Sequence, residues 1–335
     1  MINKIYNKIR NFILDEWKFL LVLICLIFIT IYPVDCYVIT GGGTISATDR
    51  VKVAGAKKKK GSFNLAYVSE LKGTIYTYIL SYIIPSYERE DISGYKYENE
   101  DSDVIDFRND LLLKVANNNA IYVAYNAAHK KIVSKNKNLY VYHVMKEADT
   151  DLEVGDKIVE VDGHKIDDYE DLKKYLETLH NNDVVSIKIV KNDKTKTKTA
   201  KLYEKDEILY MGVSLLTDED YDLSPKLDLK FKKSEGGPSG GLMMSLEIYS
   251  QLVNKDITNG KTIVGTGTID REGTVGEIDG IKYKLKGAVK ADADIFIAPT
   301  GNNYKEALKE KKKNKYKIRI IEAKTFEQVI SELSK

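Results

Sequence analysis

Hydrophobic positions divide the chain into an apolar start and a long mixed remainder. Phe19–Val34 is a run of sixteen residues without a charge. As a helix it would be roughly 24 Å long, slightly shorter than a bilayer core. Further on, isoleucine and tyrosine at helical spacing predict a helix over 74–87, and a second helix is expected over 103–129. Glycine clusters and β-branched residues predict short strands and turns over 37–55, and another strand is expected over 62–72.

The flanks of the apolar run indicate how it would cross a membrane. The first basic residue after it is Arg50, whereas four basic residues precede it: Lys4, Lys8, Arg10 and Lys18. This bias places the N-terminus inside. The segment YPVDCYVIT has no small-residue cleavage site, and Val34-Asp35 before Cys36 does not suit a lipoprotein. We therefore expect a cytoplasmic N-terminus at 1–18 and an uncleaved transmembrane signal anchor at 19–38, held in the lipid bilayer; a buried core helix is the alternative.

Residues 132–205 have a different pattern, with short strands around one helix. The predicted elements are strands at 139–144, 157–162 and 184–190 and a helix at 169–179. Their order and the string GDKIVEVDGHKI resemble a PDZ domain. The resemblance implies a groove that adds a peptide C-terminus as a strand and holds its carboxylate with backbone N–H groups. The family's glycine-containing carboxylate loop is not visible before Leu139, where the sequence reads SKNKN, so the groove residues are not assigned.

Charge and cysteine content narrow the possible functions. The chain has 52 basic and 50 acidic residues, a net charge of +2, which is too even to suggest nucleic acid as a partner. The charge is blocky, and we interpret the run Lys57–Lys60 as a solvated surface. Cys25 and Cys36 are the two cysteines, and they allow neither a disulfide framework nor a thiolate metal site. No metal or cofactor is expected.

A candidate nucleophile lies in the segment Glu235–Gly241, which reads EGGPSGG. Pro238 fixes the backbone just before Ser239, and the flanking glycines allow a substrate backbone to approach closely. If the apolar stretch from Leu242 onward is a helix, Ser239 lies just before its N-terminus, where free N–H groups favour a developing oxyanion. Taken alone, such a turn before a buried helix is more often structural.

A nucleophilic serine needs a base, and the sequence favours lysine over histidine. The C-terminal region contains none of the four histidines, which are His129, His143, His164 and His180. A Ser-His-Asp triad is therefore disfavoured. Burial lowers the pKa of a lysine from about 10.4 towards neutrality, which leaves a free amine able to take the serine proton. GEIDGIKYKLKGA offers three candidates: Lys282, Lys284 and Lys286.

The serine turn and the lysine segment together resemble the proteolytic domain of Lon-type serine peptidases. That family has a G-P-S-[AG]-G turn and a G-G-[LIV]-x-x-K string, which implies that Ser239 is the nucleophile and Lys284 the base, with Lys282 facing solvent. The family's T-G-x-[ILV] strand matches here and implies that Thr266 orients the lysine. We expect backbone N–H groups near Gly237 and Ser239 to stabilise the oxyanion. This chain departs from the family in Gly236, where an acidic residue is frequent, and in Asp279, where a paired glycine is usual.

The whole chain resembles a membrane-anchored bacterial branch of Lon-like peptidases that contains a PDZ domain. This implies an α+β protein with an N-terminal transmembrane helix (19–38), an N-terminal α/β region (39–131), a β-rich PDZ-like module (132–205) and a Lon-type α/β proteolytic domain (206–335). It also implies a single-pass cell-membrane protein whose catalytic domain is extracytoplasmic. Assembly of several copies into a ring is implied by the resemblance alone.

The expected function is an ATP-independent serine endopeptidase with a Ser-Lys dyad that cleaves unfolded or membrane-proximal polypeptides. A phosphate-binding loop would need glycine where Lys255 stands, before Asn259-Gly260-Lys261-Thr262, so no ATP-driven unfoldase is expected. Two alternatives remain open. One is a catalytically silent, membrane-tethered PDZ adaptor, and the other is processing confined to the chain itself.

Overall fold

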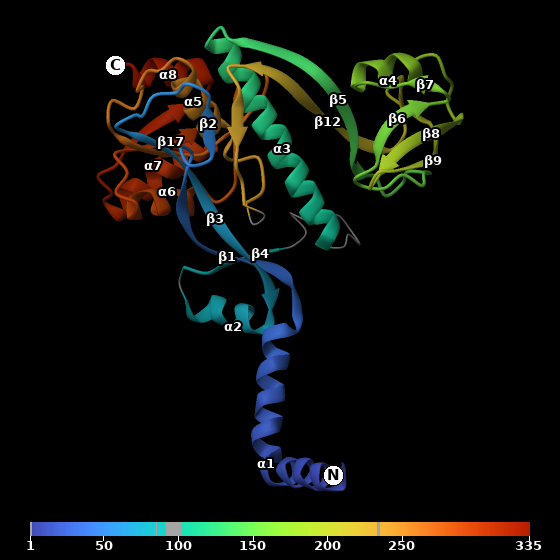
Figure 1. Ribbon diagram of the computed structural model, residues 1–335, viewed down its shortest axis with the longest axis vertical. Helices are drawn as coiled ribbons and strands as arrows, with labels where there is room; N and C mark the ends of the chain where they lie inside the picture. Colours follow the sequence, from blue (N-terminus) through green and yellow to red (C-terminus); the bar gives the residue numbers. More distant parts are fainter. Residues whose placement is uncertain (1, 85, 92–101, 233–234) are drawn as a thin grey trace. The chain divides into compact units, whose positions relative to one another are not determined.

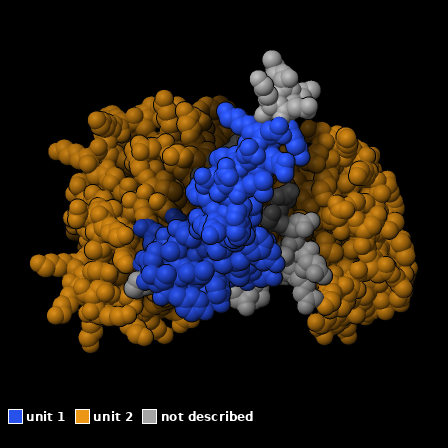
Figure 2. Space-filling view, turned by 90° about the horizontal axis from the view of Figure 1, so that it is seen from below, with its two compact units in different colours: residues 1–42, 68–99 blue, residues 43–67, 100–335 orange. Residues whose placement is uncertain are grey.

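The computed structural model describes residues 2–84, 86–91, 102–232 and 235–335. The chain forms two compact units, one of residues 1–42 and 68–99 and the other of residues 43–67 and 100–335 (Figure 2). Two strands, β1 (Pro33–Ser46) and β3 (Ser62–Thr74), belong partly to each unit.

The first unit begins with the long helix α1 (Ile2–Ile31), which bends at Glu16, where φ is −107° and ψ is 15° (Figure 1). The helix ends just before Pro33, because a residue that precedes proline disfavours helical geometry. The β-branched residues that follow enter β1 instead. Within the described residues, no helix is long and apolar enough to cross a membrane. The expected transmembrane helix at 19–38 is not supported by this finding, and the localisation stays a prediction.

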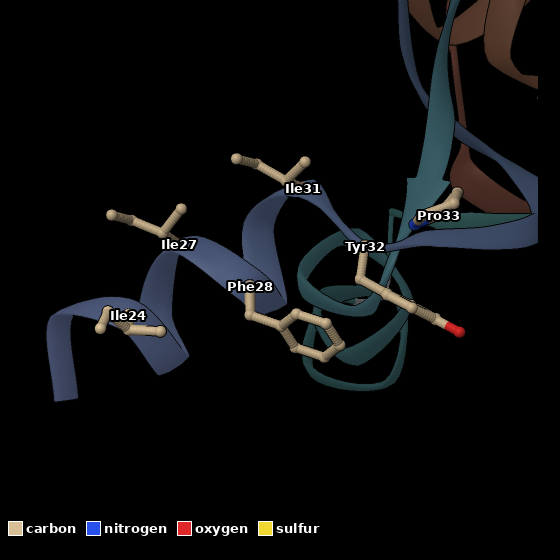
Figure 3. Close-up of a pocket in the computed structure, with 6 residues that line it drawn as sticks. All are labelled: Ile24, Ile27, Phe28, Ile31, Tyr32 and Pro33. Carbon is tan, nitrogen blue, oxygen red and sulfur yellow. The ribbon is translucent and has the colours of Figure 1, made fainter. Parts of the chain in front are cut away.

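The C-terminal end of α1 exposes its apolar side chains. Figure 3 shows Ile24, Ile27, Phe28 and Ile31 along the helix, each of them largely exposed. The Phe28 ring lies 4.8 Å from the ring of Tyr32.

The rest of the first unit is a short helix and a short strand. Helix α2 (Ile75–Ile83) begins at Thr74, whose side chain accepts from the backbone of Thr77 while the Thr77 hydroxyl accepts in return. This reciprocal cap satisfies two N–H groups that the first helical turn leaves open. Strand β4 (Glu88–Asp91) pairs antiparallel with residues 36–39 of β1. The predicted helix over 74–87 is confirmed, with an earlier end.

The second unit contains a β-rich module built from one antiparallel sheet and a helix. Its strand order is β12-β5-β6-β8-β9, with β7 paired to β6. Leucine, isoleucine and valine from these strands pack with Leu172 and Leu176 of the helix into one core. The elements are β5 (Lys131–Val144), β6 (Lys157–Val161), β7 (His164–Lys165), α4 (Tyr169–Leu176), β8 (Val184–Lys191), β9 (Lys194–Lys201), β10 (Tyr203–Lys205), β11 (Ile208–Tyr210) and β12 (Val213–Ser224).

The same unit contains a largely parallel sheet with helices on both faces. Its strands β18, β17, β14 and β3 lie side by side, and each neighbouring pair is parallel. Along β17, Ile295 and Ile297 join one hydrophobic core while Phe296 and Ala298 join another. A parallel strand covered on both faces is expected to be apolar throughout. The elements are α5 (Gly241–Leu252), β14 (Thr262–Gly265), β15 (Thr268–Ile269), β16 (Val275–Gly276), α6 (Ile281–Lys290), β17 (Ile295–Pro299), α7 (Asn302–Asn314), β18 (Arg319–Ala323) and α8 (Phe326–Leu333).

A long helix, α3 (Ser102–Ala127), packs against α5 and confirms the helix predicted over 103–129. Its residues Ala120, Ala124 and Tyr125 are fully buried in the core that also holds α5 and α8. The Tyr125 hydroxyl donates to the carbonyl oxygen of Pro225 at 2.6 Å, and burial raises the pKa of this tyrosine to about 12. Two further short strands pair beside this core: β2 (Val51–Val53) and β13 (Leu227–Leu229).

Candidate active site

Ser239 lies in a tight turn directly before α5. The N–H of Gly241 donates to the carbonyl oxygen of Pro238 at 3.2 Å, and α5 continues from Gly241 as an almost wholly buried helix. Ser239 itself is half-buried. The predicted position of this serine at a helix N-terminus is confirmed. Such a position provides backbone N–H groups without helical partners and the positive end of the helix dipole.

Thr266 holds the backbone of the candidate nucleophile. The carbonyl oxygen of Ser239 accepts one hydrogen bond from the Thr266 hydroxyl at 3.0 Å and another from the N–H of Gly267 at 2.8 Å. In return, the carbonyl oxygen of Gly267 accepts from the N–H of Leu242 at 3.1 Å. Thr266 is completely buried and directly follows β14. The structure therefore brings Ser239 and Thr266 together, although the contact that it shows runs to the serine backbone.

Lys284 is a buried lysine on the helix beside β14. It is 3% exposed, whereas Lys282 is half-buried with its ammonium 4.9 Å from the ring centre of Tyr283. Its helix α6 contacts β14, the strand that leads into Thr266. The helix starts after Gly280, whose φ of +70° is left-handed and favours glycine. The left-handed conformation falls on Gly280, so this turn keeps its glycine even though Asp279 replaces the first glycine of the family's pair.

The N–H of Gly237, which we expected to stabilise an oxyanion, already has a partner. It donates to the carbonyl oxygen of Asn109 in α3 at 3.3 Å. By contrast, the N–H groups of Ser239 and Gly240 have no acceptor in the part of the chain that the structure describes. Gly240 was not among the residues selected from the sequence, and its position at the start of α5 is the signal that identifies it.

Two carboxylates that sequence reasoning missed lie on either side of Ser239. Glu235 pairs with Arg50, and Glu247 pairs with Lys59. The signal for Glu247 was present, since it is a charge inside the apolar stretch LMMSLEIYSQL. Its partner Lys59 had no such signal in the sequence, because this residue belongs to the lysine run that we interpreted as solvated. Among the described residues, no group of three or more histidine, cysteine, aspartate or glutamate side chains is placed to hold a metal ion.

Comparison with known proteins identifies two domains. Residues 232–334 match the family model of the Lon protease (S16) C-terminal proteolytic domain, and residues 110–202 match that of the PDZ domain. No curated protein matches the chain.

Three solved structures are similar to parts of the chain. The PDZ domain of an SdrC-like protein from Listeria monocytogenes is 26% identical over 25% of this chain and 92% of that one, with a TM-score of 0.23. A protein from Geobacillus thermodenitrificans is 23% identical over 23% of this chain and 94% of that one, with a TM-score of 0.21. The second domain of a Listeria protein is 26% identical over 25% and 87%, again with a TM-score of 0.21.

The two family matches agree with the resemblances drawn from the sequence. The Lon-type match covers Ser239, Thr266 and Lys284, and the PDZ match covers the GDKIVEVDG string. The chain thus combines a PDZ domain with a Lon-type (S16) proteolytic domain, the architecture of a PDZ-containing Lon-like serine peptidase.

Proposed function

We propose that this protein is an ATP-independent serine endopeptidase in which Ser239 is the nucleophile and Lys284 the general base. The observation that carries the proposal is the burial of Lys284, which is 3% exposed on a helix packed beside β14. Burial disfavours the charged form of an ammonium group, and a neutral amine is what a lysine base requires. The Lon-type match supports the serine peptidase class.

The reaction would proceed through an acyl-enzyme. The neutral amine of Lys284 takes the proton of the Ser239 hydroxyl while its oxygen bonds to the peptide carbonyl carbon. The negative charge that develops on the carbonyl oxygen is stabilised by the N–H groups of Ser239 and Gly240 at the start of α5. The C–N bond then breaks, and the lysine returns its proton to the leaving amine. Water then attacks the ester. Lys284 takes a proton from this water and gives it to the Ser239 oxygen as the acyl group leaves.

Thr266 can support both partners of this dyad. Its hydroxyl hydrogen is committed to the carbonyl oxygen of Ser239. A hydroxyl also has acceptor lone pairs, and these are free to accept from the ammonium form of Lys284 in the proposed mechanism. Thr266 would then orient the lysine, as the family resemblance implies, while fixing the serine backbone.

The test compares substitutions of Ser239 and Lys284 with a control substitution of the neighbouring Lys282. Ser239→Ala and Lys284→Met should abolish cleavage of casein, an unfolded substrate, while Lys282→Ala should retain it. Methionine nearly preserves the volume of the buried lysine stem, so the thermal unfolding midpoint should change little. Cleavage by either folded dyad variant would overturn the proposal.

We also propose that the PDZ domain selects polypeptide substrates by their C-termini. Strand β12 forms one edge of its sheet, and Gly212 just before it has a φ of +73°. Val213 and Leu215 at the start of the strand are partly buried against the PDZ core. A peptide adding to this edge would place its carboxylate at the turn that contains Gly212. Peptides with a free C-terminus should bind more tightly than amidated ones, and equal affinities would contradict this assignment.

The silent adaptor remains a second candidate because of one contact. The Gly237 N–H, which we expected to stabilise an oxyanion, donates to the carbonyl oxygen of Asn109 in α3. A serine-reactive acylating probe separates the two functions, since a peptidase is labelled at Ser239 and an inert adaptor is not.

A further inference from the structure

Residues 48–60, which we call the strap, connect β1 to β3 and lie along the helix that follows Ser239. The strap contains β2, whose backbone is bound by one side chain of α5. Gln251 accepts from the N–H of Val53 at 2.9 Å and donates to the carbonyl oxygen of Val51 at 3.1 Å. These two bonds fix the strap against the C-terminal half of α5.

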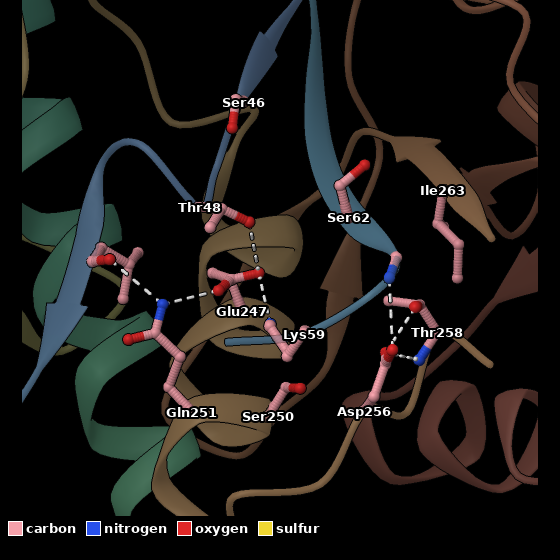
Figure 4. A network of polar contacts seen from close by, with 12 residues as sticks. Ser46, Thr48, Lys59, Ser62, Glu247, Ser250, Gln251, Asp256, Thr258 and Ile263 are labelled. Atoms are coloured by element: carbon pink, nitrogen blue, oxygen red, sulfur yellow. Dashed lines mark hydrogen bonds and ion pairs between the residues drawn. The ribbon is translucent and has the colours of Figure 1, made fainter. Parts of the chain in front are cut away.

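The first ionic contact of the strap is with Glu247, two turns into α5 (Figure 4). The carboxylate of Glu247 is fully buried and accepts from Gln251 at 2.6 Å and Thr48 at 3.3 Å. Its third donor is the ammonium of Lys59 at 2.8 Å, and the Lys59 side chain is only 7% exposed. The neighbouring lysines 57, 58 and 60 are exposed. One lysine of the predicted solvated run is thus a buried counter-ion of the nucleophile helix.

The second ionic contact is with Glu235, four residues before Ser239. Arg50 donates to one oxygen of this carboxylate from Nε at 2.9 Å and to the other from Nη2. The N–H of Lys232 donates to the carboxylate as well, at 3.2 Å. Burial opposes ionisation, but the Arg50 and Lys232 hydrogen bonds outweigh it and lower the pKa of Glu235. A two-bond guanidinium–carboxylate pair restricts orientation as well as distance.

We propose that the strap positions the Ser239 nucleophile. Arg50 is a positioning residue that holds the segment before Ser239, and Lys59 holds the helix after it. Both cations come from one short segment, and they pair with one carboxylate before Ser239 and one after it in the sequence. A displacement of about 1 Å at a reacting group can reduce a rate by roughly a hundredfold. The inference rests on the proposed peptidase function, since it concerns the geometry of the same serine.

The Arg50–Glu235 pair is the better of the two to test. The side chains of Arg50 and Glu235 are 15% and 12% exposed, so water can reach them when the pair is broken. The Lys59–Glu247 pair is deeper, and its loss would leave a carboxylate without its counter-ion in the core. Lys52 is the matched control, because it is an exposed basic residue in β2, two positions from Arg50.

The kinetic experiment compares Arg50→Gln, Glu235→Gln and Lys52→Gln in the full chain. We expect the first two to lower kcat for casein and the rate of probe acylation at Ser239 at least tenfold, with KM within about twofold of the parent. Lys52→Gln should leave all three unchanged. Arg50→Lys should recover part of the rate, because it restores the charge but not the two-bond geometry. Unchanged kcat in folded Arg50→Gln would overturn the inference, as would a loss equal to that of Lys52→Gln.

A second measurement works without catalysis and separates this inference from the proposed function. In a Ser239→Ala background, Arg50→Gln should speed amide hydrogen exchange in residues 235–242 and leave α6 unchanged. Unchanged exchange in 235–242 would overturn the role of the strap. If the unsubstituted chain neither cleaves casein nor reacts with the probe, the peptidase proposal fails, whereas the exchange result still decides whether the strap holds the serine turn.

Discussion

The hydroxyl of Thr266 donates to the carbonyl oxygen of Ser239 at 3.0 Å, which links the end of β14 to the turn that carries this candidate nucleophile. The sequence resemblance had assigned Thr266 to the lysine. The observed contact adds a structural role, because the N–H of Met244 in α5 donates to the Gly240 carbonyl and the Ser239 carbonyl has its partners outside the helix. Thr266 and the N–H of Gly267 satisfy this carbonyl together.

Two substitutions of Thr266 should therefore distinguish the contribution of its hydroxyl from that of its branched shape. Thr266→Val keeps the shape but removes the donor, which should lower the free energy of unfolding by about 1 kcal/mol and reduce kcat. Thr266→Ser keeps the donor and should retain most activity. Chemical denaturation and casein cleavage measure the two effects. Full activity in Thr266→Val would show that the hydroxyl supports neither residue of the dyad.

Two glycines of the site should differ in their tolerance of alanine. A Cβ at Gly267 would lie 2.8 Å from Val275 Cγ1, at a φ of +150° that other residues rarely adopt. We expect Gly267→Ala to lower the free energy of unfolding by about 1–3 kcal/mol. A Cβ at Gly240 would meet only the tip of Leu65, which can rotate away, so Gly240→Ala should cost less than about 1 kcal/mol. Equal unfolding midpoints for the two variants would contradict this distinction.

The sequence predicted the local features of the fold and site well. Glycine, proline and helical periodicity placed Ser239 before α5, and the resemblance to the Lon-type lysine string selected the buried Lys284 over Lys282. These features depend on neighbours within a few positions. The α3 helix and the strands of the PDZ domain were found for the same reason.

Contacts between distant segments were not predictable from pattern. Arg50 is 185 positions from Glu235, and Lys59 is 188 positions from Glu247. No pattern in the sequence around Lys57–Lys60 distinguishes the buried Lys59 from the three exposed lysines. The expected end of the apolar helix at residue 38 was too late, because counting apolar residues past Tyr32 ignored that Pro33 ends the helix and that the following residues prefer a strand.

The PDZ domain should depend on a buried ion pair at its Gly-Asp turn. Asp156 is fully buried and accepts from Lys198 Nζ at 2.8 Å and from the N–H of Glu153 at 2.8 Å. Asp156→Leu would leave Lys198 buried without its main counter-ion and should lower the free energy of unfolding by about 3 kcal/mol or more. The double variant with Lys198→Met should recover most of this loss. Glu170→Gln, at an exposed side chain in α4, serves as the control. Thermal unfolding followed by a PDZ-specific probe measures each effect, and an additive double variant would contradict the pairing.

Acid should release the far end of the strap through Asp256. Its carboxylate accepts from the N–H groups of Lys60 at 3.1 Å and Gly61 at 3.2 Å, and from the Thr258 hydroxyl at 2.5 Å. Burial opposes ionisation, but these hydrogen bonds outweigh it and hold the pKa of Asp256 below its usual value of 3.8. The unfolded chain therefore binds more protons than the folded chain at acidic pH.

It follows that the stabilisation by Asp256 is complete above about pH 4 and is lost as the pH falls through its lower folded-state pKa. At pH 7, Asp256→Asn should lower the free energy of unfolding by about 1.5–3 kcal/mol, because an amide cannot accept these bonds as a charged carboxylate does. The gap between the variant and the parent chain should narrow steadily below pH 4. Denaturation series from pH 2.5 to 7 measure this convergence, with Asp292→Asn at an exposed aspartate as the control. A gap that stays constant down to the lowest pH would show that the folded chain does not favour the ionised form of Asp256.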